Sequence, residues 1–274
     1  MNISETTRGL NERAVPELTR LPRPVYARAE DIPERKATQP HSHPWVQLSY
    51  ASRGVLKIRS RGGLFVAPPQ KAILIPPDLE HIVVNSPDTQ MRSLYIATEA
   101  LPDTGRNCEV LAVSDLLREA IRHFSMLPVE YDESGPQGRL VGVMLDLVKA
   151  APREALSLPW PETQGLRDIC ATMLDAPEQA LRREEWSTAL GVSIRTLERL
   201  FLRETGMPMR SWRLRARLLE ALPMLERGDP VTEVALACGY ESTSAFIASF
   251  RQFFGATPGS FSAQAGGPPG RSGS

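Results

Sequence analysis

Three of the chain's four histidines stand in two short motifs whose spacing could build one polar site. His41 and His43 are spaced H-x-H and precede Gln47 in "HSHPWVQLSY", and His81 follows in "PPDLEH". Because alternate residues of a strand share a face, His41, His43, Trp45 and Gln47 are expected to point the same way. Imidazoles bind divalent transition metals and also hydrogen-bond organic molecules. The pattern predicts a metal site, an organic effector site held by the same polar cluster, or a purely structural set of hydrogen-bonded histidines.

Short strands must position these side chains. Between residues 25 and 103 the runs "WVQLSY", "GVLKIRS", "KAILIPP", "HIVVN" and "MRSLYIA" are separated by glycine and proline. Many short strands with turn residues between them are typical of a small β-barrel or sandwich. We therefore expect a β-domain in this part of the chain.

After residue 103 the hydrophobic period becomes that of helices. Two segments, 109–124 and 139–149, have apolar residues at helical spacing. The apolar residues expected on their buried faces are Leu116, Leu117, Ala120, Ile121, Phe124, Leu140, Val143, Met144 and Leu147. These faces either pack on the β-domain or form the seam of a dimer.

The C-terminal half contains a predicted helix-turn-helix in "EEWSTALGVSIRTLERLFLRETG". A short helix leads to a turn at Gly191, and a second helix opens at Ser193, whose hydroxyl can cap free backbone N–H groups. Leu197, Leu200 and Phe201 would face the core. The outer face would then be polar and rich in arginine, as in a helix that reads DNA.

The same pattern recurs in "VTEVALACGYESTSAFIASFRQFFG", with a turn at Gly239 and a cap at Ser242. Phe246, Ile247 and Phe250 are predicted to face inward. A helix from Met209 to Arg227, roughly 28 Å long at 1.5 Å per residue, would separate the two units, although Pro223 should kink or end it. That length suits two reading helices about one DNA turn, roughly 34 Å, apart.

The run "ALACGYESTSAFIASFRQFFGATPGSF" resembles the C-terminal motif of the AraC/XylS family of bacterial transcription regulators, and "GVSIRTLERLFLRETGMP" resembles that family's first helix-turn-helix. The resemblance covers residues 167–261 and implies a domain that binds double-stranded DNA. It implies that the first reading helix dominates specificity, because the second carries small residues with little bidentate reach. The implied DNA-binding residues are Ser193, Arg195, Thr196, Glu198 and Arg199 in the first unit, and Thr243, Ser244, Ala245 and Ala248 in the second.

The arrangement H-x-H-x3-Q-x6-G, followed by P-x4-H-x3-N, resembles the two motifs of the cupin fold. Metal-binding cupins carry glutamate where this chain has Gln47, and glycine where it has Asp78. The resemblance covers residues 38–98 and implies that His41, His43, Gln47 and His81 gather at a sensing site. A neutral amide is a weaker metal ligand than a carboxylate, so metal affinity should be reduced.

Together these patterns predict an α+β fold of two domains, a cupin-like β-barrel with a helical connector and an all-α domain with two helix-turn-helix motifs. The expected boundaries are a flexible arm at 1–24, the sensor domain at 25–103, the connector at 104–150, a linker at 151–165, the DNA-binding domain at 166–261 and a disordered tail at 262–274.

Composition limits the remaining choices. Lysine plus arginine and aspartate plus glutamate are both 32, so gross charge indicates no partner. Three widely separated cysteines suit a reducing cytosol, and we find neither a signal peptide nor a run able to span a bilayer. By analogy with related regulators, we expect a cytoplasmic homodimer. Its expected partners are DNA and a small-molecule or metal effector, with RNA polymerase as a further candidate.

Two other functions remain open. One is a metal-dependent cupin enzyme with an accessory helical domain, although no acid/base carboxylate evidently pairs with the histidines. The other is an adaptor that does not bind DNA, because residues 160–262 hold 12 arginines, no lysine and 13 acidic residues, a net charge of −1. DNA-binding domains are usually basic. Arginines gathered on one face, namely Arg195, Arg199, Arg203, Arg210, Arg213 and Arg251, would favour DNA binding.

Overall fold

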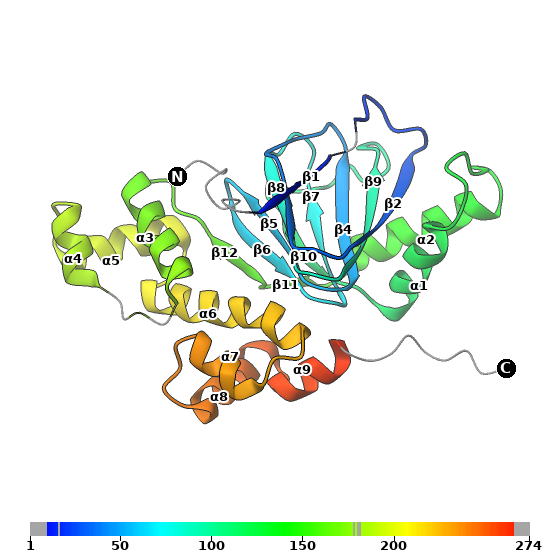
Figure 1. Cartoon of the computed structure of the whole chain (residues 1–274). Helices are drawn as coiled ribbons and strands as arrows, with labels where there is room; N and C mark the ends of the chain where they lie inside the picture. Colours follow the sequence, from blue (N-terminus) through cyan, green and yellow to red (C-terminus); the bar gives the residue numbers. More distant parts are fainter. Residues whose placement is uncertain (1–9, 16, 178, 180–181, 266–274) are drawn as a thin grey trace. The chain divides into compact units, whose positions relative to one another are not determined.

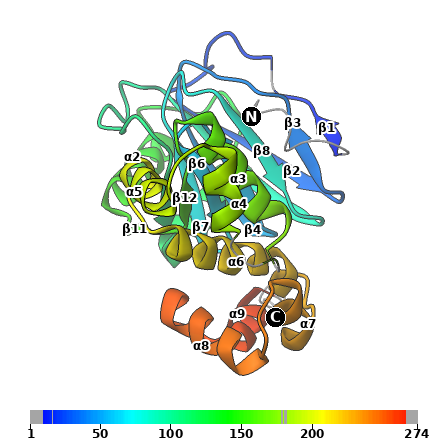
Figure 2. The ribbon, with the colours of Figure 1, turned by 90° about the vertical axis from the view of Figure 1, so that its left-hand side faces the viewer.

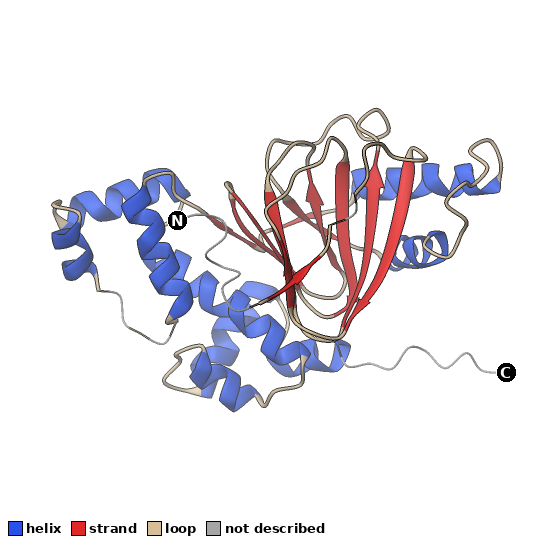
Figure 3. Ribbon diagram, turned by 45° about the horizontal axis from the view of Figure 1, so that its top comes forward, coloured by secondary structure: helices blue, strands red, loops and turns tan. Residues whose placement is uncertain are grey.

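A computed structural model of the chain describes residues 10–15, 17–177, 179 and 182–265. The chain divides into two compact units, Asn2–Ser157 and Leu158–Ser274, so the border falls inside the predicted linker (Figure 1). Strands dominate the first unit and helices form the second (Figure 3). None of the helices that the structure describes is long and apolar enough to cross a membrane.

The first unit is built from two sheets. Their strand orders are β1-β3-β8-β5-β6-β12 and β11-β10-β7-β4-β9-β2. Both sheets end in edge strands, so the described strands form two open sheets and not the closed barrel that the sequence predicts. The strands are β1 (Asn11–Arg13), β2 (Val25–Ile32), β3 (Lys36–Thr38), β4 (Val46–Arg53), β5 (Leu56–Ser60), β6 (Gly63–Ala67), β7 (Lys71–Ile75), β8 (His81–Asn85), β9 (Thr89–Ile96), β10 (Glu109–Ala112), β11 (Arg153–Glu154) and β12 (Ser157–Pro159).

Strand β4 separates the apolar core from the polar interior. Val46, Leu48 and Tyr50 join the apolar cluster formed with helices α1 (Asp115–Phe124) and α2 (Pro136–Ala150). Gln47 and Ser49 alternate with them and are also buried. Because alternate side chains of a strand point to opposite faces, β4 sends its apolar residues toward the helices and its polar residues to the other side of the sheet.

The buried stripes of α1 and α2 are narrower than predicted. Leu116 and Val143 are 62% and 47% exposed, whereas the sequence pattern places both on buried faces. The residues that α1 does bury are Leu117, Ala120, Ile121 and Phe124. Leu116 lies about 100° around the helix from Leu117, so it falls outside that stripe.

Pairing with distant strands extends the first unit beyond its predicted limits. Strand β1 lies in the predicted arm and pairs in parallel with β3. Strand β10 lies in the predicted connector and pairs with β7, and β11 in the predicted linker pairs with β10. Residues 1–9 of the predicted arm and 266–274 of the predicted tail lie outside the described residues.

The second unit is organised around α6 (Met209–Glu226), which packs against helices on both of its sides (Figure 2). Pro223 lies inside α6, yet the helix continues to Glu226 and is not ended by it. Its 18 residues span about 27 Å. The other helices are α3 (Gln164–Asp175), α4 (Arg183–Ala189), α5 (Ile194–Thr205), α7 (Val231–Ala237), α8 (Thr243–Phe254) and α9 (Pro258–Ala265).

The core of the second unit contains the three phenylalanines that the helical pattern predicts, together with Trp212. Phe201, Trp212, Phe246 and Phe250 are fully buried, but Ile247 is 37% exposed and does not face inward as expected. Helix α9 extends into the predicted tail. The three cysteines are buried, and none of them forms a disulfide within the described part of the chain.

Candidate effector site and nucleic-acid interface

Both predicted helix-turn-helix units are formed, by α4 and α5 and by α7 and α8. Gly191 and Gly239 have φ values of +64° and +73° in the two turns, a left-handed conformation that glycine adopts without steric cost. The Ser193 hydroxyl accepts a hydrogen bond from Thr196 N at 3.1 Å, and the Ser242 hydroxyl accepts one from Ala245 N at 3.2 Å. Both reading helices therefore begin at the predicted caps.

The outer face of α5 presents Arg195, Glu198 and Arg199, all exposed. Thr196 is half-buried, and its hydroxyl lies 2.9 Å from that of Ser193. Glu198 Oε1 accepts a hydrogen bond from Arg183 Nη1 of α4 at 3.0 Å. The carboxylate expected to meet a base is therefore already paired, with an arginine that the sequence pattern does not single out.

The outer face of α8 is small, as its sequence indicates. Ser244, Ala245 and Ala248 are exposed, and Thr243 is half-buried. With no long polar side chain among these four, a DNA surface would have to approach the backbone of α8 closely.

One of the six arginines whose gathering on one face would favour DNA binding makes hydrogen bonds within the helical unit. Arg213 of α6 donates a hydrogen bond to the backbone oxygen of Pro177 at 2.9 Å and another to that of Gln179. The other five are exposed: Arg195, Arg199, Arg203, Arg210 and Arg251.

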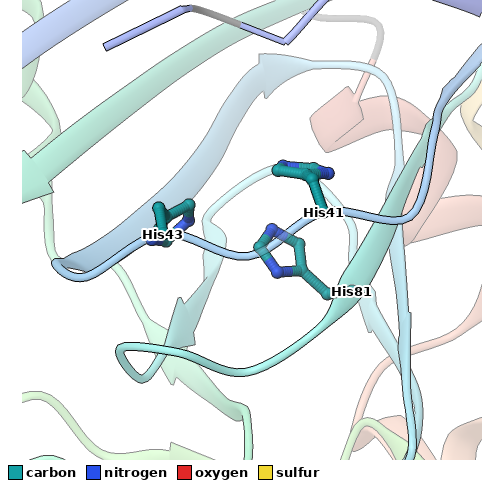
Figure 4. Close-up of side chains that lie close together, drawn as sticks. All are labelled: His41, His43 and His81. Carbon is teal, nitrogen blue, oxygen red and sulfur yellow. The ribbon is translucent and has the colours of Figure 1, made fainter. Parts of the chain in front are cut away.

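The three predicted histidines of the first unit come together (Figure 4). His41 and His43 lie in the segment between β3 and β4, and His81 opens β8. The backbones of His41 and His81 exchange two hydrogen bonds, at 3.1 and 2.9 Å. Each ring offers one ligand atom, and these atoms all lie within 4.8 Å of one another.

Backbone carbonyls fix the protonated nitrogen of each ring. The Nδ1 atoms of His41, His43 and His81 lie 2.9, 2.8 and 2.8 Å from the backbone oxygens of Gln39, Trp45 and Leu79. Since a carbonyl oxygen only accepts, each Nδ1 must carry the hydrogen. In the neutral ring Nε2 then keeps a lone pair, the form in which imidazole binds metals.

Burial keeps these rings neutral. It is the largest cause that lowers the pKa of His41 and of His43, and it lowers the pKa of His81 to about 3, helped by repulsion from His41. His81 Nε2 is shielded from water and has no hydrogen-bond partner among the described residues. A buried acceptor of this kind is costly unless a ligand occupies the site.

Gln47 adds a fourth polar side chain to the histidine cluster. Its side-chain oxygen lies 2.8 Å from His43 Nε2, and its amide nitrogen lies 2.8 Å from Ser49 Oγ. A lone pair on His43 Nε2 requires a donor opposite, which the amide supplies when it is turned by about 180°. In that orientation the Gln47 oxygen accepts a hydrogen bond from the Ser49 hydroxyl. The amide can therefore donate to His43 when it is turned, or offer its oxygen as a neutral ligand to a metal when it is not.

His41, His43 and Gln47 line a cavity of about 80 Å³, and the sequence predicts only part of its walls. Val15 and Leu18, from the predicted arm, line it together with Tyr95 of β9 and Trp45. The Trp45 ring stacks on His43 at 5.2 Å, and its Nε1 donor has no partner in the described part of the chain. Only Trp45 could have been found from the sequence, since it shares the strand face of His41 and His43.

A larger cavity of about 850 Å³ lies nearby, lined by residues that include Arg61, Asp78, Leu79, Glu80 and Arg106. It shares Leu79, the hydrogen-bond partner of His81, with the histidine site. Its lining carries charges of both signs and selects no one class of ligand.

Comparison with known proteins supports both units. Residues 23–190 match the family described as AraC-like ligand binding domain, and residues 186–264 match the Helix-turn-helix domain. The chain is 32% identical over 226 residues to the HTH-type transcriptional regulator NimR of Escherichia coli K12, covering 82% of each protein. It is also 32% identical over 117 residues to the regulator RipA of Corynebacterium glutamicum, covering 40% of this chain and 35% of RipA.

Among solved structures, the DNA-binding domain of AdpA in complex with a target DNA is 30% identical over 37% of this chain and 92% of that chain, with a TM-score of 0.34. The ligand-binding family match spans more than half of the chain, and the match to NimR covers most of both proteins. The chain therefore belongs to the AraC family of transcriptional regulators, with an N-terminal ligand-binding domain and a helix-turn-helix DNA-binding domain.

Proposed function

We propose that this regulator is controlled by a divalent transition metal ion held by His41, His43 and His81, with Gln47 as a neutral fourth donor. The observation that carries the proposal is the fixed tautomer of all three rings, which leaves an Nε2 lone pair on each. The unpartnered, water-shielded Nε2 of His81 is the donor that most needs a ligand. Bound there, the ion would supply a positive charge in the interior of the sensor unit.

The size of the cavity favours a metal over an organic effector. About 80 Å³ holds an ion with one or two waters, given about 30 Å³ per water. Sites for organic ligands usually measure about 300–1,000 Å³. The neighbouring cavity of about 850 Å³ has that size, but none of the three histidines lines it. A purely structural cluster is disfavoured because it would leave His81 Nε2 buried without a partner.

Elemental analysis of protein purified without chelator tests the metal site. We expect about one zinc, nickel, cobalt or copper ion per chain and its loss in His81→Ala. The control is His123→Ala, which removes the exposed histidine of α1 and should leave the metal content unchanged. Absence of metal from the wild-type chain, including after dialysis against these ions, would overturn the proposal.

We also propose that α5 and α8 enter successive major grooves of one DNA duplex. The length of α6 supports this spacing, since about 27 Å approaches one DNA turn of roughly 34 Å. On α5, Arg195 and Arg199 would donate hydrogen bonds to guanine, and Glu198 would accept one from cytosine once Arg183 releases it. Thr196 and Ser193 would lie beside the DNA backbone at the start of the helix. On α8, Thr243 and Ser244 would bond phosphate, and Ala245 and Ala248 would contact thymine methyl groups.

We propose a homodimer formed through the outer face of α1 and α2. Leu116 and Val143 are exposed on these helices although both are large and apolar, and an interface over them would remove this apolar surface from water. Light scattering at micromolar concentration should give the mass of two chains, and Leu116→Glu should shift it to one. A wild-type monomer would refute the dimer.

The remaining partners follow from the family. RNA polymerase is the partner we propose if the chain activates transcription. The cytoplasm is the proposed place of action, because the relatives are bacterial regulators and bacterial DNA lies there. A reporter gene placed behind the bound DNA sequence would show whether transcription rises or falls.

A further inference from the structure

Arg217 of α6 binds the turn of the second helix-turn-helix. Its Nε donates a hydrogen bond to the backbone oxygen of Cys238, and its guanidinium carbon lies 4.5 Å from the centroid of the Tyr240 ring. The side chain is half-buried. Both contacts fall on the three residues Cys238–Gly239–Tyr240, which lead from α7 to the cap of α8.

These contacts continue into the reading helix. Tyr240 packs edge-on against Phe246 of α8, with ring centroids 5.2 Å apart. Tyr240 N also donates to Ala235 O of α7 at 2.9 Å. Arg217 therefore connects α6 to the buried side of α8 through one aromatic ring, while the turn itself depends on the left-handed Gly239.

Because the side chains on the outer face of α8 are small, their contact with DNA depends on the exact position of the helix. A long side chain can reorient to reach a base when its helix shifts, but Ser244, Ala245 and Ala248 have almost no reach. An error of an ångström in the position of α8 would remove their contacts. The face of α8 that meets DNA thus depends on whatever fixes α8 relative to α6.

We propose that Arg217 is a positioning residue that holds α8 at the distance from α6 needed for DNA contact, without itself touching DNA. The inference rests on the proposed binding of DNA by α5 and α8. Arginine suits this role because its planar guanidinium can stack on Tyr240 while its edge bonds a carbonyl, whereas lysine offers a point charge and no stacking plane.

The test uses the full-length chain and a duplex that the wild-type chain selects from a random-sequence pool. The selected duplex should show two protected segments about one helical turn apart. In Arg217→Met the segment contacted by α8 should lose protection, and affinity should fall about tenfold, the scale of one lost base contact. The segment contacted by α5 should stay protected, and Arg217→Lys should fall between Met and wild type.

Salt dependence separates positioning from direct contact. If Arg217 bonded a phosphate, its loss would reduce the slope of log affinity against log salt by about one. We expect the slope for the whole selected duplex to stay unchanged within error, because the α8 side chains that lose contact carry no charge. The control Arg227→Met removes an equal charge from an exposed ion pair with Asp229. This variant should protect both DNA segments as the wild type does. Should Arg217→Met unfold, Tyr240→Leu removes the other side of the same contact and should give the same selective loss.

The possible outcomes are distinct. Wild-type protection of both segments by folded Arg217→Met and Tyr240→Leu, or equal loss of both segments, would overturn the positioning role of Arg217. A pool from which the wild-type chain enriches no sequence would overturn the proposed DNA contacts and this inference with them. Protection of both segments by the wild type, and of only the α5 segment by Arg217→Met, would support the proposed DNA contacts and the positioning role of Arg217.

Discussion

At the residue scale, the histidine site depends on three backbone carbonyls as much as on three histidines. The H-x-H spacing and the later P-x4-H motif correctly predict that the rings meet. They could not show that each Nδ1 faces a carbonyl two residues away, because that depends on the local backbone path. The tautomer, and with it the position of the Nε2 lone pairs, is therefore visible only in the structure.

Gln47→Glu should strengthen metal binding at the proposed site. The carboxylate would be buried beside His43, where it costs several kcal/mol unless a cation neutralises it. In chelator the variant should melt below the wild type, and the rise in melting temperature on adding zinc or nickel should be larger than that of the wild type. Gln90→Glu, at an exposed position of β9, is the control; equal responses of the two variants would contradict a metal at Gln47.

Arg195→Ala and Arg199→Ala should each relax base preference at one position of the bound DNA. A bidentate arginine–guanine contact contributes about 1–3 kcal/mol of discrimination, so each variant should lose about that much on the selected duplex and much less on a duplex changed at that position. Competition binding against single-base variants of the duplex measures this. Equal losses on all sequences would show phosphate contact and refute base reading.

At the element scale, the sequence predicts helices from their caps and turns more accurately than it predicts which distant strands pair. Ser193, Ser242 and the turn glycines are set by neighbours within a few residues, so the sequence placed α5 and α8 correctly. Strands β1, β10 and β11 depend on partners far along the chain, and nothing in their own residues predicts that pairing. The sequence likewise does not show that Arg213 bonds backbone carbonyls within the fold. Those carbonyls lie in the segment before α4, more than thirty residues away along the chain.

Glu204 of α5 links the reading helix to the start of α3. Its carboxylate accepts hydrogen bonds from Glu162 N at 3.0 Å, Thr163 N at 2.9 Å and Thr163 Oγ1 at 2.7 Å. Glu204→Gln keeps the shape but removes the charge, and charge-assisted hydrogen bonds contribute about 1.5–3 kcal/mol. Urea unfolding at pH 7 should show a loss of about that size. Glu185→Gln, in an exposed pair with Arg182, should lose less than about 1 kcal/mol.

The effect of Glu204 should fade in acid. Burial alone would raise its pKa, but the hydrogen bonds from Thr163 and Glu162 outweigh burial and leave the pKa below its usual value of 4.5. The stabilisation is therefore complete above that value and is lost as pH falls through the lower native pKa. The difference between wild type and Glu204→Gln should be constant near pH 7 and shrink below about pH 4.5. A difference that grows in acid would contradict this assignment.

At the scale of the whole molecule, the chain combines a site that could sense a cation with a unit that binds DNA, and regulation requires that each affect the other. A ligand shifts an equilibrium only if it binds one state more tightly than another. The net charge of −1 over residues 160–262, which favours an adaptor, is compatible with DNA binding. Glu198 and Asp229 pair with Arg183 and Arg227, and Glu204 accepts hydrogen bonds from Thr163, while Arg195, Arg199, Arg210 and Arg251 are exposed.

This coupling must be reciprocal. If the metal changes DNA affinity by some factor, typically about 5- to 150-fold, saturating DNA must change metal affinity by the same factor. We expect equal factors when DNA affinity is measured with and without metal and metal affinity is measured with and without the selected duplex. His81→Ala should make DNA affinity insensitive to metal, whereas Arg195→Ala should weaken DNA binding and leave metal affinity without DNA unchanged. Metal bound at full stoichiometry with no effect on DNA affinity would make the histidine site structural, because a ligand with no differential affinity for the two states cannot act as a signal.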